Sequence, residues 1–198
     1  PVLCTLLGSR FGEVQQLSGI FAATVKRLAS RYPELVVVAP TVTALMAPIQ
    51  EITASWSAPA IVVDSQKEKY DAMAASNAAL AASGTVSLEL AMARVPSIVT
   101  YRLPWLTYFV VKWMSLIRFV TLINIILDRE VVPELLQRNC APKQLCEAVT
   151  QLLETGGMEQ VIASRDALVR IGIDGERPSI RAARALLKIV NNSPEKAL

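Results

Sequence analysis

A turn followed by a glutamate is the part of this 198-residue chain that is best suited to chemistry. It lies in the run SGTVSLEL, in which Ser83 and Gly84 are expected to form the turn and Glu89 lies one helical turn after Thr85. Backbone N–H groups at the start of a helix, together with the helix dipole, suit a diphosphate. Gly84 lets a ligand approach the backbone, Thr85 can donate its hydroxyl, and Glu89 can accept both hydroxyls of a ribose. The alternative is an ordinary helix cap with Glu89 in solvent.

A second candidate site is the run GSRFGEV near the start of the chain. Gly8 and Ser9 suit a tight loop after an apolar run, and Arg10 then lies at the carboxyl end of a strand, where open α/β sheets bind ligands. The planar guanidinium of Arg10 can make two hydrogen bonds to a phosphate. The alternative is an exposed ion pair with Glu13. Neither run matches GxxxxGK[ST] or GxGxxG.

The residue types that the chain lacks exclude several classes of chemistry. It has no histidine, which removes histidine-dependent nucleophiles, histidine-ligated metals and a histidine general base. Its three cysteines show no CxxC spacing, so we expect a reducing compartment, no disulfide framework and no zinc site. We also expect no cofactor. The net charge of +3 comes without a broad basic patch, which argues against nucleic acid as a partner.

A stretch rich in aromatic and basic residues, 103–127, has no acidic residue. We expect it to contact a membrane interface, where its cations would meet anionic headgroups. Because Lys112 and Arg118 are charged, the charge-free segments between them are too short for a membrane span, which needs roughly 20 apolar residues. The alternative is a core or oligomer-interface helix, which would permit a homodimer. The expected membrane-contacting residues are Trp105, Tyr108, Phe109, Lys112, Trp113 and Arg118.

Polar residues further along the chain give weaker signals. Asn124 lies inside the apolar run LINIIL and is expected either to find a buried hydrogen bond or to face a ligand. Glu134 and Gln137 are expected one turn apart on a short helix after Pro133.

Apolar runs of strand length alternate with segments of helical period, which predicts an α/β fold. The expected strands are residues 2–7, 35–39, 60–64, 78–81 and 97–101. The expected helices are residues 13–31, 43–55, 68–75, 86–93, 142–153, 159–171 and 179–190. The interleaving predicts a Rossmann-like parallel sheet with helices on both faces and a helical C-terminal extension. We expect one domain over residues 1–190 and a tail over 191–198, with an N-terminal portion missing.

The order of these motifs resembles lipid-A-disaccharide synthase over residues 2–190. The pattern is LLGSRxxEV, then SGTxSLELA with a downstream VP, then LxN, then VPELLQ. The resemblance implies the C-terminal, nucleotide-binding lobe of a glycosyltransferase-B fold. That family transfers 2,3-diacylglucosamine from UDP-2,3-diacylglucosamine to 2,3-diacylglucosamine 1-phosphate, which yields the lipid A disaccharide and UDP without a metal. Its members are peripheral proteins on the cytoplasmic face of the inner membrane in Gram-negative bacteria.

The resemblance also implies residue roles. Arg10, Asn124 and Gln137 match polar residues that the family needs for activity. The UDP site matches Gly8, Ser9, Arg10, Ser83, Gly84, Thr85 and Glu89, and the aromatic stretch matches the membrane-contacting surface. The chain departs from the family at Leu7, where proline is usual, and it lacks the acceptor lobe and the general base that an inverting transfer needs. We therefore expect binding of the donor without turnover.

Two other functions remain open from the sequence. A UDP-sugar epimerase-like enzyme shares this fold and the diphosphate site but does not need an interfacial aromatic stretch. A membrane-docking nucleotide-binding module would share both features and catalyse nothing.

Overall fold

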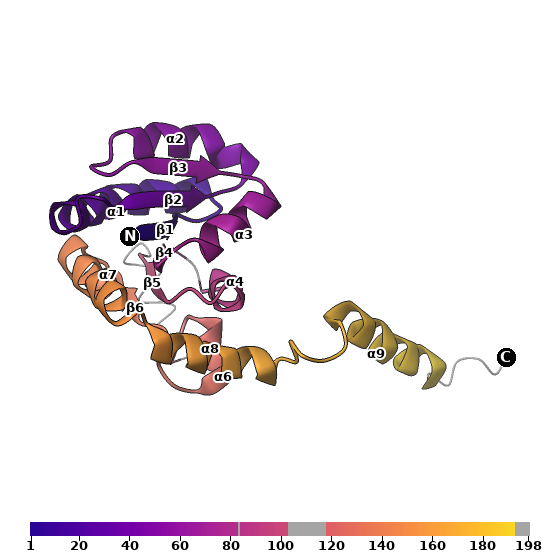
Figure 1. Ribbon diagram of the computed structural model, residues 1–198. Helices are drawn as coiled ribbons and strands as arrows, with labels where there is room; N and C mark the ends of the chain where they lie inside the picture. Colours follow the sequence, from indigo (N-terminus) through magenta and orange to yellow (C-terminus); the bar gives the residue numbers. More distant parts are fainter. Residues whose placement is uncertain (83, 103–117, 193–198) are drawn as a thin grey trace.

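Six parallel strands form the centre of the fold, in the order β3-β2-β1-β4-β5-β6 (Figure 1). The computed structural model describes residues 1–82, 84–102 and 118–192. The strands are β1 (Val2–Leu6), β2 (Val36–Pro40), β3 (Ala60–Val63), β4 (Ala78–Ala81), β5 (Ser97–Tyr101) and β6 (Glu134–Leu136). Because β1 pairs with both β2 and β4, the strand order reverses direction between β1 and β4. All six carboxyl ends lie at one edge of the sheet, and ligands bind at such a reversal.

Helices cover both faces of this sheet. They are α1 (Phe11–Arg31), η1 (Thr43–Leu45), α2 (Met46–Ala54), α3 (Gln66–Ala74), α4 (Val86–Met92), α6 (Leu122–Leu127), η2 (Gln137–Asn139), α7 (Pro142–Thr155), α8 (Met158–Arg170) and α9 (Pro178–Asn192). Residues of α1, α2 and α7 share one core cluster, and residues of α3, α4, α6 and α8 share the other. The sheet is therefore covered on both sides, as its unbroken apolar strands require.

The side-chain alternation of the strands divides the core between these two faces. Leu3 packs with Phe21 and Leu28 of α1, while its neighbour Cys4 packs with Met73 of α3 on the opposite face. All of these side chains are fully buried. Burying one large apolar side chain contributes about 1.5–3 kcal/mol, so the central strands are held from both sides.

The predicted parallel sheet and all five predicted strands are confirmed, each to within one residue at either end. The short helix predicted after Pro133 is wrong. Residues Glu134–Leu136 instead form a sixth strand, in which Val99 pairs with Glu134 and Tyr101 with Leu136. Three residues carry too little periodicity to be assigned from sequence, and the free edge of β5 decides their conformation.

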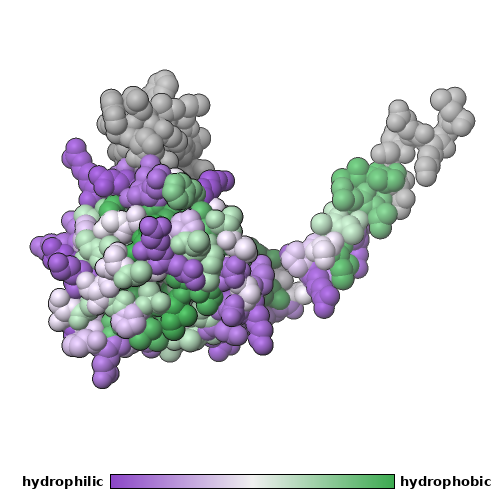
Figure 2. All heavy atoms as spheres, turned by 90° about the horizontal axis from the view of Figure 1, so that it is seen from above, coloured by the Kyte–Doolittle hydropathy of each residue, from purple (hydrophilic) through white to green (hydrophobic). Residues whose placement is uncertain are grey.

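Helix α9 extends away from the rest of the molecule (Figures 1 and 2). Its large apolar side chains are exposed, namely Ile180, Leu186, Leu187, Ile189 and Val190. The helix reaches Asn192, two residues beyond the end expected for it. It contributes no residue to either core cluster.

Candidate functional site

A cleft of about 220 Å³ opens at the carboxyl ends of β1 and β2, next to the start of α4. Its lining residues are Leu6, Gly8, Ser9, Pro40, Thr41, Val42, Lys69, Thr85, Val86 and Glu89. The cleft thus lies beside the reversal of strand order between β1 and β4. It brings together the two runs that the sequence indicated for chemistry, although they are far apart in the chain.

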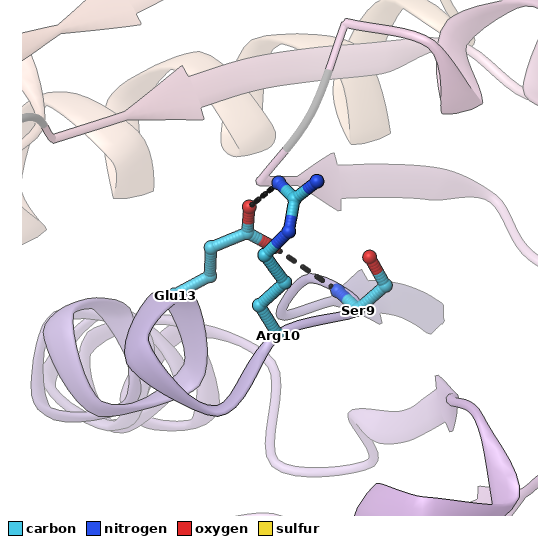
Figure 3. A network of polar contacts seen from close by, with 3 residues as sticks. All are labelled: Ser9, Arg10 and Glu13. Atoms are coloured by element: carbon cyan, nitrogen blue, oxygen red, sulfur yellow. Dashed lines mark hydrogen bonds and ion pairs between the residues drawn. The ribbon is translucent and has the colours of Figure 1, made fainter.

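The turn after β1 forms one wall of the cleft. Gly8 has a φ of +112°, which favours glycine, and an added Cβ would collide with the side chain of Glu13. The Ser9 N–H donates to Glu13 Oε2 at 3.1 Å, and Arg10 Nη1 donates to Glu13 Oε1 at 3.2 Å (Figure 3). Glu13 therefore fixes the shape of this turn from the first turn of α1.

Arg10 lies beside the cleft and does not line it. Its side chain is 82% exposed, and its ion pair with Glu13 is the alternative that the sequence left open. Its carbonyl accepts from the N–H groups of Glu13 and Val14, which starts α1. Within the described residues, the guanidinium pairs with Glu13, whose side chain is 13% exposed, and the solvent around Arg10 limits such a pair to about 1 kcal/mol.

The opposite wall of the cleft comes from α3 and α4. Thr85 immediately precedes α4, and Glu89 lies within α4, one helical turn after Thr85. Both residues line the cleft. Glu89 is not simply solvated, because its Oε2 pairs with Lys69 Nζ of α3 at 2.5 Å. Ser83 lies outside the described residues.

Gly84 is buried and lies close to backbone atoms of another segment of the chain. A Cβ added to Gly84 would collide with the carbonyl oxygen of Val120 and lie 3.2 Å from the Cα of Thr121. The close backbone approach that the sequence indicated is therefore made, within the structure, by the segment that leads into α6. Any approach of a ligand to Gly84 remains a prediction.

Asn124 takes the first of its two alternatives, a buried hydrogen-bonding position. Its side chain is 0% exposed, and its Oδ1 accepts from the N–H groups of Val131 and Val132 at 2.8 and 2.9 Å. Its Nδ2 donates to the Val132 carbonyl at 2.8 Å and to Glu134 Oε1 at 2.9 Å. With both amide atoms satisfied, Asn124 holds the loop before β6 and does not line the cleft.

Gln137 lies just beyond the carboxyl end of β6, at the same edge of the sheet as the cleft. Its φ is +52°, an unfavourable value for a residue with a side chain. It is half-buried and does not line the cleft. The role of Gln137 in activity stays a prediction.

Most of the expected membrane surface lies outside the described residues, namely Trp105, Tyr108, Phe109, Lys112 and Trp113. Arg118 is described and exposed, and its guanidinium carbon lies 5.4 Å from the centre of the Phe119 ring. Across residues 1–82, 84–102 and 118–192, no helix combines the length and apolar character needed to cross a membrane. The same described residues contain no group of three or more side chains of metal-ligand type.

Two residues at the site carried no functional assignment from the sequence. Lys69 lies in α3, where no motif marks it, and it reaches the cleft only because β2 and β1 lie side by side. The sequence indicates Glu134 only as a neighbour of Gln137. Its carboxylate accepts from the N–H groups of Val120 and Thr121, which orients the start of α6.

The sequence pattern of one protein family, described as lipid-A-disaccharide synthetase, matches residues 1–188. The chain belongs to the lipid-A-disaccharide synthase family. It is 44% identical to the lipid-A-disaccharide synthase of Paramagnetospirillum magneticum, over 98% of this chain and 51% of that protein. It is 46% identical to the synthase of Rhodospirillum centenum, over 96% of this chain and 48% of that protein. The chain thus spans about half the length of these relatives.

The fold of this synthase-family chain is also similar to the folds of solved structures. The calicheamicin glycosyltransferase CalG4 superposes with a TM-score of 0.59 at 18% identity, over 98% of this chain and 43% of that one. A Staphylococcus aureus MnaA–UDP structure superposes with a TM-score of 0.56 at 16% identity, over 98% of this chain and 47% of that one. The expected similarity to glycosyltransferase-B enzymes is therefore confirmed for the fold.

Proposed function

We propose that this chain is the donor-binding half of an inverting glycosyltransferase of lipid A biosynthesis. Its reaction transfers 2,3-diacylglucosamine from UDP to 2,3-diacylglucosamine 1-phosphate and releases UDP. The observation that carries this proposal is a cleft lined by Ser9 of the turn after β1, by Thr85 before α4 and by Glu89 of α4, in a chain of the synthase family. The two turns lie at the edge of the sheet where α/β proteins bind nucleotides.

In the proposed complex, the uridine ribose lies against Glu89, whose carboxylate accepts its hydroxyl groups. The diphosphate lies between the two turns. Its expected partners are Gly8, Ser9, Arg10, Ser83, Gly84 and Thr85. Arg10 is free to rotate toward it because its present ion pair is exposed. Hydrogen bonds that involve charged groups contribute about 1.5–3 kcal/mol each, enough for selective nucleotide binding.

We assign the chain to the C-terminal half of the synthase. In the transfer, a hydroxyl of the acceptor forms a bond to the anomeric carbon, the bond to UDP breaks, and a general base takes the hydroxyl proton. Acceptor and base belong to the other half, so this chain alone binds the donor and does not turn it over. Asn124 and Gln137 support activity from positions outside the cleft.

The aromatic and basic stretch, including Arg118, is proposed to contact the cytoplasmic face of the inner membrane of a Gram-negative bacterium. Both substrates are acylated, so a protein at this surface meets them where they reside. A homodimer is compatible with the same apolar stretch.

Isothermal titration of the chain with UDP tests the proposal, with ADP and GDP as controls. We expect selective UDP binding that falls roughly tenfold or more in Glu89→Ala, since charge-assisted hydrogen bonds to ribose are lost. Glu51→Ala, an exposed residue of α2, is the matched control and should bind as the parent does. A preference for ADP or GDP would contradict the assignment.

Two further measurements separate the competing functions. An epimerase-like enzyme shares the fold, as the similarity to a UDP-GlcNAc 2-epimerase from Neisseria meningitidis indicates at 18% identity and a TM-score of 0.51, but it does not require binding to liposomes. A docking module binds liposomes yet gives no transfer when the acceptor half is supplied. The synthase proposal predicts both liposome binding and restored transfer, and it is favoured by 44% identity over 98% of the chain.

A further inference from the structure

Lys69 is a cation inside the cleft that no motif marks. It comes from α3, and its Nζ lies 2.5 Å from Glu89 Oε2. The Lys69 side chain is 23% exposed and that of Glu89 is 33% exposed, so the pair is only partly hydrated. Glu89 Oε2 itself is buried, which leaves Oε1 and the methylene groups as the exposed part of this side chain.

The neighbourhood of the cleft contains two carboxylates, and each has its own cation. Glu13 beside the cleft pairs with Arg10, and Glu89 within it pairs with Lys69. A diphosphate brings several negative charges into the same partly enclosed space. Two like unit charges about 4 Å apart repel by about 4 kcal/mol at an effective dielectric constant of about 20, which is typical near a protein surface. A carboxylate that binds ribose must therefore be neutralised before an adjacent diphosphate can bind well.

We propose that Lys69 is the charge-compensating residue for a nucleoside diphosphate in this cleft. The inference rests on the proposed function and adds a residue to its site. Lys69 neutralises Glu89 at Oε2, leaves Oε1 to the ribose, and so supplies the positive charge that admits the diphosphate. Its charge therefore matters for UDP and not for uridine, which has the same ribose and no phosphate.

The test compares UDP and uridine on the full chain by NMR titration, which measures both strong and millimolar binding. Lys69→Met removes the charge and keeps much of the apolar stem, while Lys69→Arg keeps the charge. Lys67→Met is the matched control, since Lys67 is an exposed lysine on the same helix and lines no part of the cleft. Thermal unfolding of each variant checks that the fold is retained.

For Lys69→Met we expect UDP to bind about tenfold more weakly and uridine to change by less than about twofold, as Coulomb interaction with the diphosphate dictates. Lys69→Arg should stay near the parent, and Lys67→Met should not change either ligand. Equal weakening of UDP and uridine would overturn the charge role, because Lys69 would then act only by holding Glu89. Unchanged UDP affinity in Lys69→Met would also overturn it. Failure of the parent chain to bind UDP would instead refute the nucleotide site, and this inference with it.

Discussion

Asn124 and Glu134 lie ten residues apart in the chain and are joined by a hydrogen bond of 2.9 Å from Asn124 Nδ2 to Glu134 Oε1. The same carboxylate accepts from the N–H of Val120, whose carbonyl lies against Gly84. A buried amide outside the cleft is thereby connected to the turn that precedes α4. Loss of Asn124 should affect nucleotide binding through this connection.

Asn124→Ala should destabilise the chain strongly. The substitution leaves the N–H groups of Val131 and Val132 without their acceptor, and each unsatisfied buried group costs about 1–3 kcal/mol. We expect a loss of about 3 kcal/mol in the free energy of unfolding, measured by urea denaturation. Asn139→Ala, at an exposed position in η2, should change it by less than about 0.5 kcal/mol. A loss below 1 kcal/mol for Asn124→Ala would contradict the structural role.

Gly84→Ala should weaken both the fold and the site. The new Cβ meets the Val120 carbonyl, and backbone atoms cannot move aside as a flexible side chain can. Overpacking of this kind costs about 1–3 kcal/mol and should also shift the turn that is proposed to bind UDP. Gly19→Ala is the matched control. No atom lies within 4 Å of a Cβ there, and the change should stabilise α1 by about 0.5–1 kcal/mol. Calorimetric unfolding and UDP titration of both variants measure these effects.

Arg10→Ala should affect function more than stability. Its exposed ion pair with Glu13 contributes at most about 1 kcal/mol, so the free energy of unfolding should change by less than that. UDP affinity should fall about tenfold, and transfer should fall further when the acceptor half is supplied. Arg27→Ala, at an exposed site on the same helix, should leave both unchanged. Proportional loss of stability and affinity would make Arg10 a structural residue.

Cys4 should make the protein less stable in alkali. Burial raises the pKa of its thiol from 9.0 to about 12. Between these values the unfolded chain loses the thiol proton and the folded chain keeps it. The contribution to stability is therefore complete below pH 9 and falls by about 1.4 kcal/mol per unit as the pH rises toward 12. The slope in urea denaturation should be shallower in Cys4→Ala, whereas Cys146→Ala, at a half-buried position, should retain it.

The sequence predicted the sheet because its central strands are continuous apolar runs, a pattern that a parallel sheet covered on both faces requires. The family resemblance also implied one UDP site. Of its seven expected residues, Gly8, Ser9, Thr85 and Glu89 line the cleft, Arg10 and Gly84 do not, and Ser83 lies outside the described residues. These four residues lie together because the residues after parallel strands meet at one edge of the sheet, and their role in binding UDP stays a prediction.

The contacts that could not be predicted depend on which elements become neighbours. Lys69 meets Glu89 because α3 and α4 cover the same face of the sheet, a relation that no local pattern encodes. Glu134 lies on a three-residue strand whose existence depends on the exposed edge of β5. The roles of both residues come from tertiary packing, which overrides local propensity for such short segments.

The exposed connection between α8 and α9 offers a practical route to a shorter protein. Every buried hydrophobic side chain of the described residues lies between Leu3 and Leu168, and Arg177 stands exposed just before α9. Because Pro178 follows Arg177, trypsin does not cut there, but brief treatment with a glutamyl endopeptidase should cut after the neighbouring exposed Glu176 and release α9 from a body that stays folded. Since α9 carries exposed Leu186, Leu187 and Val190, the trimmed body should remain dispersed at higher concentrations than the whole chain, which suits it to crystallisation with UDP.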